Sequence, residues 1–314
     1  MKGRIKKDLP EGVIVPIPTP LLNFDKIDLD GLSNLIEHLV SAGVAGISIL
    51  GHTGEEHCLD FEVRRTMISE TCRIVDSRIP VLVSISDTSF NESFVLACYA
   101  NVCGAAAMVF SPPYYLTAGQ AEIKEYYEDL LKVMPLPVLL YNIESPSETN
   151  IDTSTILGLL ENDKIVGLKD SSADMVYMKL VAQSAKEIRP DFKLYSGKEE
   201  VLFETVMLGG AGGFAGGANL FPKLYIQLYN AIKAGDLDLC KKLESILMEI
   251  NKTIFSIGHY HSSYLKGIKC ALNLMGIFSS DYMAPPFHKF NEPERFRVHE
   301  GITIIRKKLQ EYGI

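Results

Sequence analysis

The sequence predicts a (β/α)8 barrel, the TIM-barrel class of α/β fold, followed by a C-terminal helical extension. Short apolar runs alternate with longer amphipathic segments through the first part of the 314-residue chain. Nearly continuous apolar strands that alternate with helices indicate a parallel sheet covered on both faces. Eight such runs in roughly 210 residues favour a closed barrel. An open, doubly wound sheet is the alternative, because periodicity alone does not show closure.

The expected strands are short apolar runs bounded by turn residues. They are Val13–Ile17, Gly46–Leu50, Val81–Ile85, Ala106–Phe110, Val138–Tyr141, Ile165–Lys169, Lys193–Ser196 and Gly213–Gly216. The amphipathic segments between the runs predict helices at 29–43, 60–76, 89–102, 119–133, 153–161, 174–187 and 198–208.

After Gly217 the strand pattern stops and only helical patterns follow. Gly235 supplies a helix stop and Asp236 the next N-cap. We therefore expect residues 1–235 to form the barrel, and 236–314 to form a helical extension packed on it rather than an independent domain. The helices expected here are 221–234, 236–257, 260–274 and 292–312, with "APPF" at 284–287 as a break.

Composition excludes several classes of function. With 47% apolar and 22% charged residues the chain is an ordinary globular one, and its net charge of −8 argues against nucleic acid or anionic membrane as a partner. No apolar run approaches 18 residues, and no apolar segment follows the basic N-terminus, so neither a membrane span nor a signal peptide is expected. Six cysteines without CxxC spacing indicate reduced thiols and a cytoplasmic protein.

The ends of the predicted strands carry the chemistry, because barrel active sites lie at the carboxyl ends of the strands. The polar groups expected there are His52, Thr53, Tyr114 or Tyr115, Tyr141 and Lys169. Burial in a dry pocket lowers the pKa of a lysine, and the neutral amine can attack a carbonyl to form a Schiff base. A tyrosine within reach can shuttle the protons. The alternative is that Lys169 extends to water or pairs with Asp170.

Five motifs, in consistent order, resemble the dihydrodipicolinate synthase / N-acetylneuraminate lyase family of pyruvate-handling class I aldolases. The resemblance begins at "VPIPTPL" and covers nearly the whole chain. The motifs are "GHTGEE" at 51–56, "PPYY" at 112–115, "YN" at 141–142, "GLKDSS" at 167–172 and "GGANLFP" at 216–222.

The resemblance implies that Lys169 is the Schiff-base lysine and Tyr141 the proton-transferring tyrosine beside it. Thr53, with the backbone amides of "HTG" that include Gly54, would bind the pyruvyl carboxylate. Phe214 would contact pyruvate through its backbone. No cofactor is implied beyond the covalent lysine imine.

The resemblance also implies an assembly. Tyr115 matches a tyrosine that reaches into the proton relay of the neighbouring subunit, and Tyr114 would pack at that interface. Family members are commonly tetramers built from dimers, so a homotetramer is expected.

Two departures from the family pattern bear on the substrate. His52 stands where synthases resemble "GTTGE", and an imidazole there could relay protons or reshape the pocket. In "YNIESPSETN", Pro146 takes the place of an arginine that receives the second substrate's carboxylate, with Glu144 and Glu148 close by. Losing a guanidinium disfavours an acidic aldehyde. A neutral, hydroxylated aldehyde is therefore expected, as in 2-keto-3-deoxy sugar-acid aldolases, with Glu144 as a substrate-binding candidate.

The sequence thus predicts a lyase that joins pyruvate to an aldehyde or cleaves the product. The alternatives are a dihydrodipicolinate synthase, a 2-keto-3-deoxy sugar-acid dehydratase that uses the same imine, or a non-catalytic 2-oxo acid sensor. No metal site is expected, because the order His52, Glu55, Glu56, His57 matches no zinc motif. The glycines at 210–217 follow a helical run rather than a strand, which disfavours dinucleotide binding.

Overall fold

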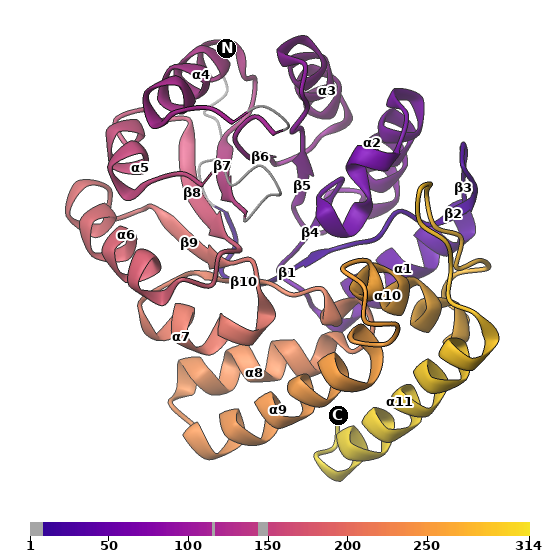
Figure 1. Ribbon diagram of the computed structural model, residues 1–314. Coiled ribbons are helices and arrows are strands. Elements are labelled where there is room, and N and C mark those ends of the chain that lie inside the picture. Colours follow the sequence, from indigo (N-terminus) through magenta and orange to yellow (C-terminus); the bar gives the residue numbers. More distant parts are fainter. Residues whose placement is uncertain (1–8, 115–116, 144–149) are drawn as a thin grey trace. The chain divides into compact units, whose positions relative to one another are not determined.

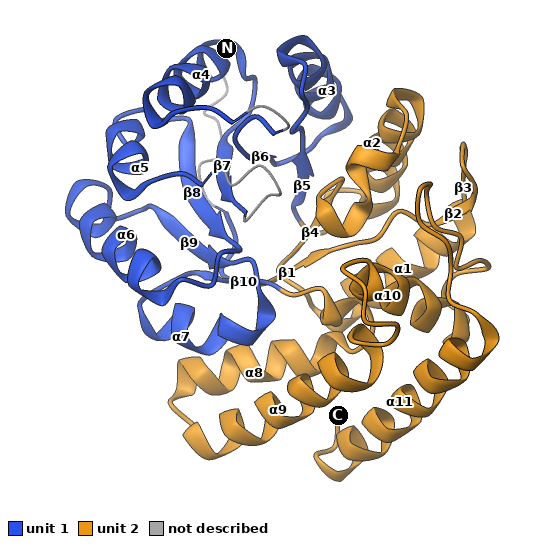
Figure 2. Ribbon diagram, in the orientation of Figure 1, with its two compact units in different colours: residues 1–12, 80–214 blue, residues 13–79, 215–314 orange. Residues whose placement is uncertain are grey.

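The structure is a computed structural model that describes residues 9–114, 117–143 and 150–314 (Figure 1). The chain divides into two compact units (Figure 2). Unit 1 comprises residues 1–12 and 80–214, and unit 2 comprises residues 13–79 and 215–314. The division falls after residues 12, 79 and 214, so it does not test the predicted boundary at residue 235, which stays a prediction.

The sheet is a closed barrel with the hydrogen-bonded strand order β1-β10-β9-β8-β7-β6-β5-β4. Closure confirms the (β/α)8 prediction, and the open-sheet alternative is wrong. The last strand ends before Gly216, since a short 3-10 helix, η4 (Gly217–Asn219), follows it. The barrel strands are β1 (Gly12–Pro16), β4 (Gly46–Ile49), β5 (Val81–Ser84), β6 (Ala107–Phe110), β7 (Val138–Asn142), β8 (Ile165–Asp170), β9 (Lys193–Ser196) and β10 (Gly212–Phe214).

Helices follow the strands as predicted. In many of them the N-cap side chain accepts a hydrogen bond from a backbone amide of the first turn. Examples are Asp28, Asp60, Ser89 and Asp174. The segment expected as helix 198–208 starts as a 3-10 turn, η3 (Glu199–Val201). The helices up to residue 235 are α1 (Leu29–Ala42), α2 (Phe61–Val75), α3 (Phe90–Cys103), α4 (Gln120–Val133), α5 (Thr153–Leu159), α6 (Met175–Ile188), α7 (Leu202–Met207) and α8 (Pro222–Ala234).

The C-terminal segment is helical, with shorter helices than predicted. Gly235 ends α8 in a left-handed conformation and Asp236 caps α9 (Leu237–Ile250), as expected. The predicted helix 236–257 ends in a π-helical turn, η5 (Asn251–Phe255). Gly258 and His259 both have positive φ and so interrupt the helix. The next helix, α10 (Ser263–Leu274), therefore begins at 263 rather than 260, and α11 (Glu292–Glu311) is the last.

Periodicity missed the shortest elements. A two-stranded hairpin, β2 (Leu21–Asn23) with β3 (Lys26–Ile27), follows β1. The 3-10 turns η1 (His52–Gly54) and η2 (Glu56–Cys58) follow β4. Segments of two or three residues are too short to display a repeat.

Gly167 lies where β8 approaches β9 closely. A Cβ at this position would collide with the backbone carbonyl of Lys193. We expect Gly167→Ala to lower the free energy of unfolding by about 1–3 kcal/mol, because backbone atoms cannot yield as a side chain can. Urea denaturation measures the change. The matched control is Gly51→Ala, since an added Cβ at Gly51 has no atom within 4 Å, and an equal loss in the control would contradict the steric explanation.

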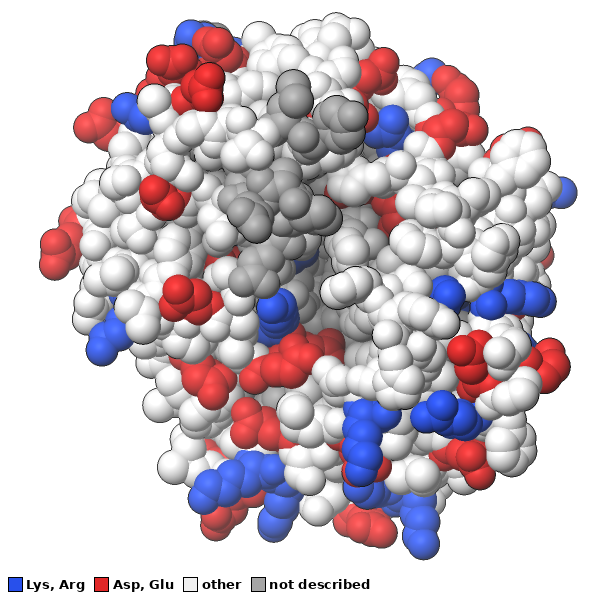
Figure 3. Space-filling view, in the orientation of Figure 1, with Lys and Arg blue, Asp and Glu red and all other residues white. Residues whose placement is uncertain are grey.

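The surface mixes the two signs of charge. On the face in Figure 3, Lys and Arg side chains lie among Asp and Glu side chains rather than gathering in one large basic area. Over residues 9–114, 117–143 and 150–314, no helix combines the length and the hydropathy that crossing a bilayer requires.

Candidate active site

Lys169 lies near the carboxyl end of β8 in unit 1 and is only 6% exposed. Its amine is 3.8 Å from the centroid of the Tyr141 ring and 4.7 Å from that of Phe214. Tyr141 is its register partner on β7, and Tyr195 is its register partner on β9. The expectation that this lysine extends into solvent, raised as the alternative, is wrong.

The lysine has aromatic surroundings. The Tyr195 ring packs edge-on against Phe214, with centroids 5.7 Å apart, and the Tyr195 hydroxyl donates to the carbonyl of Pro10. Both rings are buried. Ring faces attract a cation, so this part of the site can stabilise positive charge on the lysine nitrogen.

Tyr141 has a hydroxyl neighbour from the segment after β8. The Ser171 hydroxyl donates to the Tyr141 hydroxyl at 3.4 Å, and both residues are buried. A serine beside a tyrosine hydroxyl can pass a proton to it or fix its orientation. Ser171 belongs to the motif "GLKDSS", but no role for it is predicted from the sequence.

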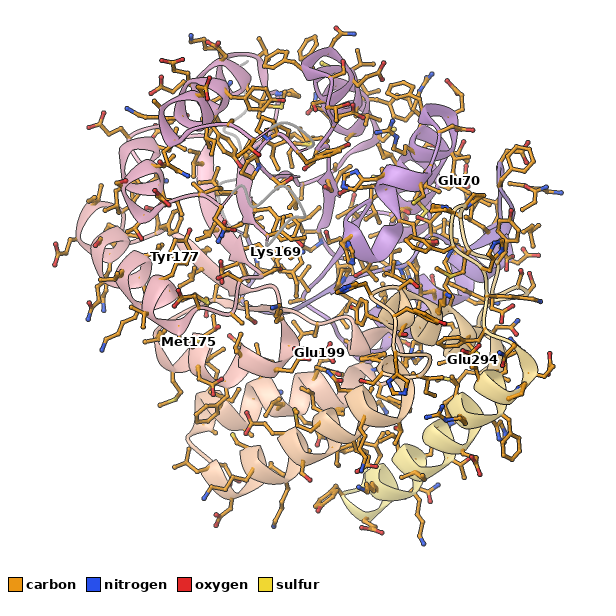
Figure 4. The ribbon with its side chains drawn as sticks, in the orientation of Figure 1. Glu70, Lys169, Met175, Tyr177, Glu199 and Glu294 are labelled. Carbon is orange, nitrogen blue, oxygen red and sulfur yellow. The ribbon has the colours of Figure 1, made fainter. Side chains whose placement is uncertain are left out.

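Asp170, the neighbour of Lys169, belongs to the opposite face of β8 because side chains alternate along a strand. Its carboxylate accepts hydrogen bonds from the Asn142 amide at 2.7 Å and from the Ser172 hydroxyl. Burial raises the pKa of this carboxyl, and these hydrogen bonds act against that rise. In Figure 4, Lys169 lies on β8, whereas Met175 and Tyr177 come from the adjoining helix α6.

In unit 2, the loop after β4 places Thr53 and Gly54 in a buried 3-10 turn. The Gly54 amide donates to the carbonyl of Gly51 at 2.8 Å, and the Gly54 carbonyl accepts from the Thr19 hydroxyl at 2.7 Å. Thr19 is fully buried in the loop after β1. These two hydrogen bonds fix the backbone of Gly54, the residue that follows Thr53.

The same loop contains two left-handed residues that are not glycine, Leu50 (φ 56°) and Glu55 (φ 58°). Such conformations cost about 1–2 kcal/mol each and persist where the surroundings impose them. Glu55 is 3% exposed. Its carboxylate forms an ion pair with Lys269 of α10 and accepts a hydrogen bond from the backbone amide of Ala284. Desolvation lowers the pKa of Lys269, and the Glu55 carboxylate opposes this. This buried pair fastens the loop to the C-terminal segment.

Tyr264 of α10 is the other contact of Thr53. Their hydroxyl oxygens are 3.4 Å apart, and the Tyr264 ring packs edge-on against Phe255 with centroids 5.0 Å apart. Tyr264 is not predicted from the sequence, since nothing in a helical repeat shows that one of its residues contacts a loop more than 200 positions earlier.

The structure thus separates the predicted site residues. Unit 1 brings together Lys169, Tyr141 and Phe214, and unit 2 holds Thr53 and Gly54. His52 is exposed, and its carbonyl accepts the amide of Glu55. Tyr115 and Glu144 lie outside the described residues. Within the described ranges, no group of three or more His, Cys, Asp or Glu side chains is arranged to hold a metal ion.

The chain resembles known proteins over nearly its whole length. The sequence profile of the dihydrodipicolinate synthetase family matches residues 9–305. The chain is 28% identical, over 93% of its length and 96% of the relative's, to the probable 2-dehydro-3-deoxy-D-pentonate aldolase YjhH of Escherichia coli.

Two solved structures are similar over nearly their whole length. A dihydrodipicolinate synthase from Bacteroides thetaiotaomicron is 47% identical, with a TM-score of 0.91 over 95% of this chain and 99% of that one. YagE of Escherichia coli K12, solved in complex with pyruvate, is 27% identical, with a TM-score of 0.89 over 95% of this chain and 99% of that one.

Proposed function

Because the chain belongs to the dihydrodipicolinate synthetase family, and is thus a lyase of that family, we propose that it acts on pyruvate and an aldehyde through a Schiff base on Lys169. The observation that carries this proposal is the position of the Lys169 amine, buried at a strand end between the rings of Tyr141 and Phe214. A barrel places its reactive groups at such strand ends.

Imine formation gives a chemical role to the buried amine of Lys169. The neutral amine adds to C2 of pyruvate, and the resulting carbinolamine loses water to give an iminium. Loss of a C3 proton then gives an enamine that attacks the aldehyde carbon, and hydrolysis frees Lys169; cleavage follows the reverse path. The faces of Tyr141 and Phe214 favour the cationic iminium.

Tyr141 is proposed to carry the protons for these steps, since its side chain contacts the lysine and its hydroxyl accepts from Ser171. Thr53 is proposed to bind the pyruvate carboxylate. The Gly54 amide already donates to Gly51, so it must share its hydrogen with a ligand. The Thr53 hydroxyl is therefore proposed to make the main hydrogen bond to the pyruvate carboxylate.

The second substrate is proposed to be a neutral, hydroxylated aldehyde, which makes the chain a 2-keto-3-deoxy sugar-acid aldolase. Support comes from the loss of the arginine at Pro146 and from the aldolase relative YjhH. The second candidate is a dihydrodipicolinate synthase, favoured by the structure from Bacteroides thetaiotaomicron at 47% identity. A dehydratase would share the imine but release water, and a sensor would bind pyruvate without turnover.

Borohydride reduction in the presence of pyruvate tests the imine. We expect a pyruvate-sized adduct on the peptide that contains Lys169, detected by mass mapping. An adduct on another lysine, or none, would refute the mechanism. Product analysis with glyceraldehyde, aspartate semialdehyde and N-acetylmannosamine then separates the two candidates, because turnover of aspartate semialdehyde alone would identify the synthase.

Tyr141→Phe is expected to lower kcat by roughly 10²- to 10⁴-fold while leaving pyruvate trapping on Lys169 intact, because proton transfer is lost and the nucleophile is not. Steady-state kinetics and trapping are measured on the same preparation. Tyr177→Phe is the matched control, since the Tyr177 hydroxyl donates to the backbone carbonyl of Ile151 and not to a residue assigned to the site. Full turnover by Tyr141→Phe would remove the proton-transfer role.

The homotetramer remains a proposal that follows from the family resemblance, and the cytoplasmic location one that follows from six cysteines without CxxC spacing. Native mass spectrometry tests the first: a monomer at micromolar concentration with full activity would exclude any catalytic role of Tyr115 across a subunit interface.

A further inference from the structure

We propose that Tyr264 is a positioning residue that fixes the Thr53 hydroxyl as a donor to the substrate carboxylate, and so sets the preference for 2-oxo acids over neutral 2-oxo compounds. The inference rests on the proposed function, in which Thr53 binds that carboxylate. It gives α10, a helix of the C-terminal segment, a part in substrate selection.

The Tyr264 side chain is held at three points within unit 2. Its ring packs edge-on against the buried Phe255. Its hydroxyl lies 3.4 Å from the Thr53 hydroxyl. The same hydroxyl sits directly against Gly216, where an added Cβ would overlap with it.

Gly216 is itself a fixed support. The fully buried Asn219 amide donates to the carbonyl of Gly216 at 2.8 Å and to that of Pro16 at 2.9 Å. A side chain at 216 would occupy the place of the tyrosine hydroxyl, so the glycine allows the Tyr264–Thr53 contact. The buried Lys269–Glu55 ion pair, on the same helix and the same loop, fixes α10 against the residues around Thr53.

The direction of the hydrogen bond follows from the ligand. A carboxylate accepts hydrogen bonds only, so a threonine that binds it must donate its single hydroxyl hydrogen to it. The threonine oxygen can then accept from Tyr264. The two hydroxyls form a short chain that points toward the anion, and each bond polarises the next.

Phenylalanine at position 264 keeps the ring and removes the donor. We expect Tyr264→Phe to raise the half-saturating pyruvate concentration for borohydride trapping by roughly threefold to tenfold, the value of one such hydrogen bond. Trapping at saturating pyruvate stays unchanged. Methyl pyruvate, which has no carboxylate, is expected to be trapped with the same concentration dependence by both proteins.

Two further variants establish that the effect passes through Thr53. Thr53→Val is expected to raise the half-saturating pyruvate concentration for trapping. Adding Tyr264→Phe to this variant should not raise it further, because the two residues act on the same interaction. Tyr260→Phe is the control, because Tyr260 lies just before the same helix and its side chain is 66% exposed. It should match the wild type with both ligands.

The outcomes are separable. No adduct in the wild type would refute the proposed function itself. An adduct in the wild type with an unchanged pyruvate dependence in Tyr264→Phe would overturn the role of Tyr264. Equal weakening for pyruvate and methyl pyruvate, with a lower urea midpoint, would show that the hydroxyl serves only to hold the fold, which also overturns the proposal.

Discussion

Lys169→Met is expected to lose pyruvate trapping and to lower kcat by at least about 10³-fold, because the variant has no amine to form the imine. Methionine is apolar and close to lysine in length. It therefore suits the position of Lys169, which is 6% exposed and lies beside the rings of Tyr141 and Phe214. The urea midpoint should therefore not fall. Steady-state kinetics, trapping and denaturation are measured together.

Lys164→Met is the matched control for this variant. Lys164 precedes β8, and its amine donates to the carbonyls of Leu131 and Met134. Its loss is expected to leave trapping on Lys169 in place. If Lys169→Met retained more than about a hundredth of wild-type turnover, a mechanism without the imine would be required.

Lys269→Met is expected to lower the free energy of unfolding by about 3–5 kcal/mol, the usual cost of leaving a buried charge without its partner. Lys269 is 1% exposed and Glu55 is 3% exposed. The amine also donates to the carbonyl of Tyr282 at 2.9 Å, which would lose that hydrogen bond. Urea denaturation followed by circular dichroism measures the loss.

Two comparison variants test the origin of this loss of stability. Lys132→Met removes an ion pair with Asp129 in which both side chains are exposed, and should leave the midpoint unchanged. Lys269→Met combined with Glu55→Leu removes both charges and should recover part of the stability. If Lys269→Met were as stable as Lys132→Met, the pair would not hold the strained loop that presents Thr53.

The site residues at strand ends could be predicted from the sequence. Lys169 was identified because an ammonium at the end of an apolar run is costly, and the motifs around it gave Tyr141, Phe214 and Thr53 by resemblance. Cap residues such as Asp236 were identified because side-chain capping is local. Helix 236–257 was predicted too long because apolar spacing persists through the π-helical turn, where the hydrogen bonding changes and the periodicity does not.

The sequence by itself predicted the strands and helices of the barrel, the family and the candidate lysine Lys169, because each depends on local patterns and on motifs in a fixed order along the chain. Tertiary structure alone decided that the barrel closes, that Lys169 lies between two rings, and that Ser171 contacts Tyr141. It also decided that Tyr264 and Lys269, on one C-terminal helix, contact Thr53 and Glu55. The contacts of Tyr264 and Lys269 join residues more than 200 positions apart in the sequence. No local pattern encodes which distant side chain packs beside another.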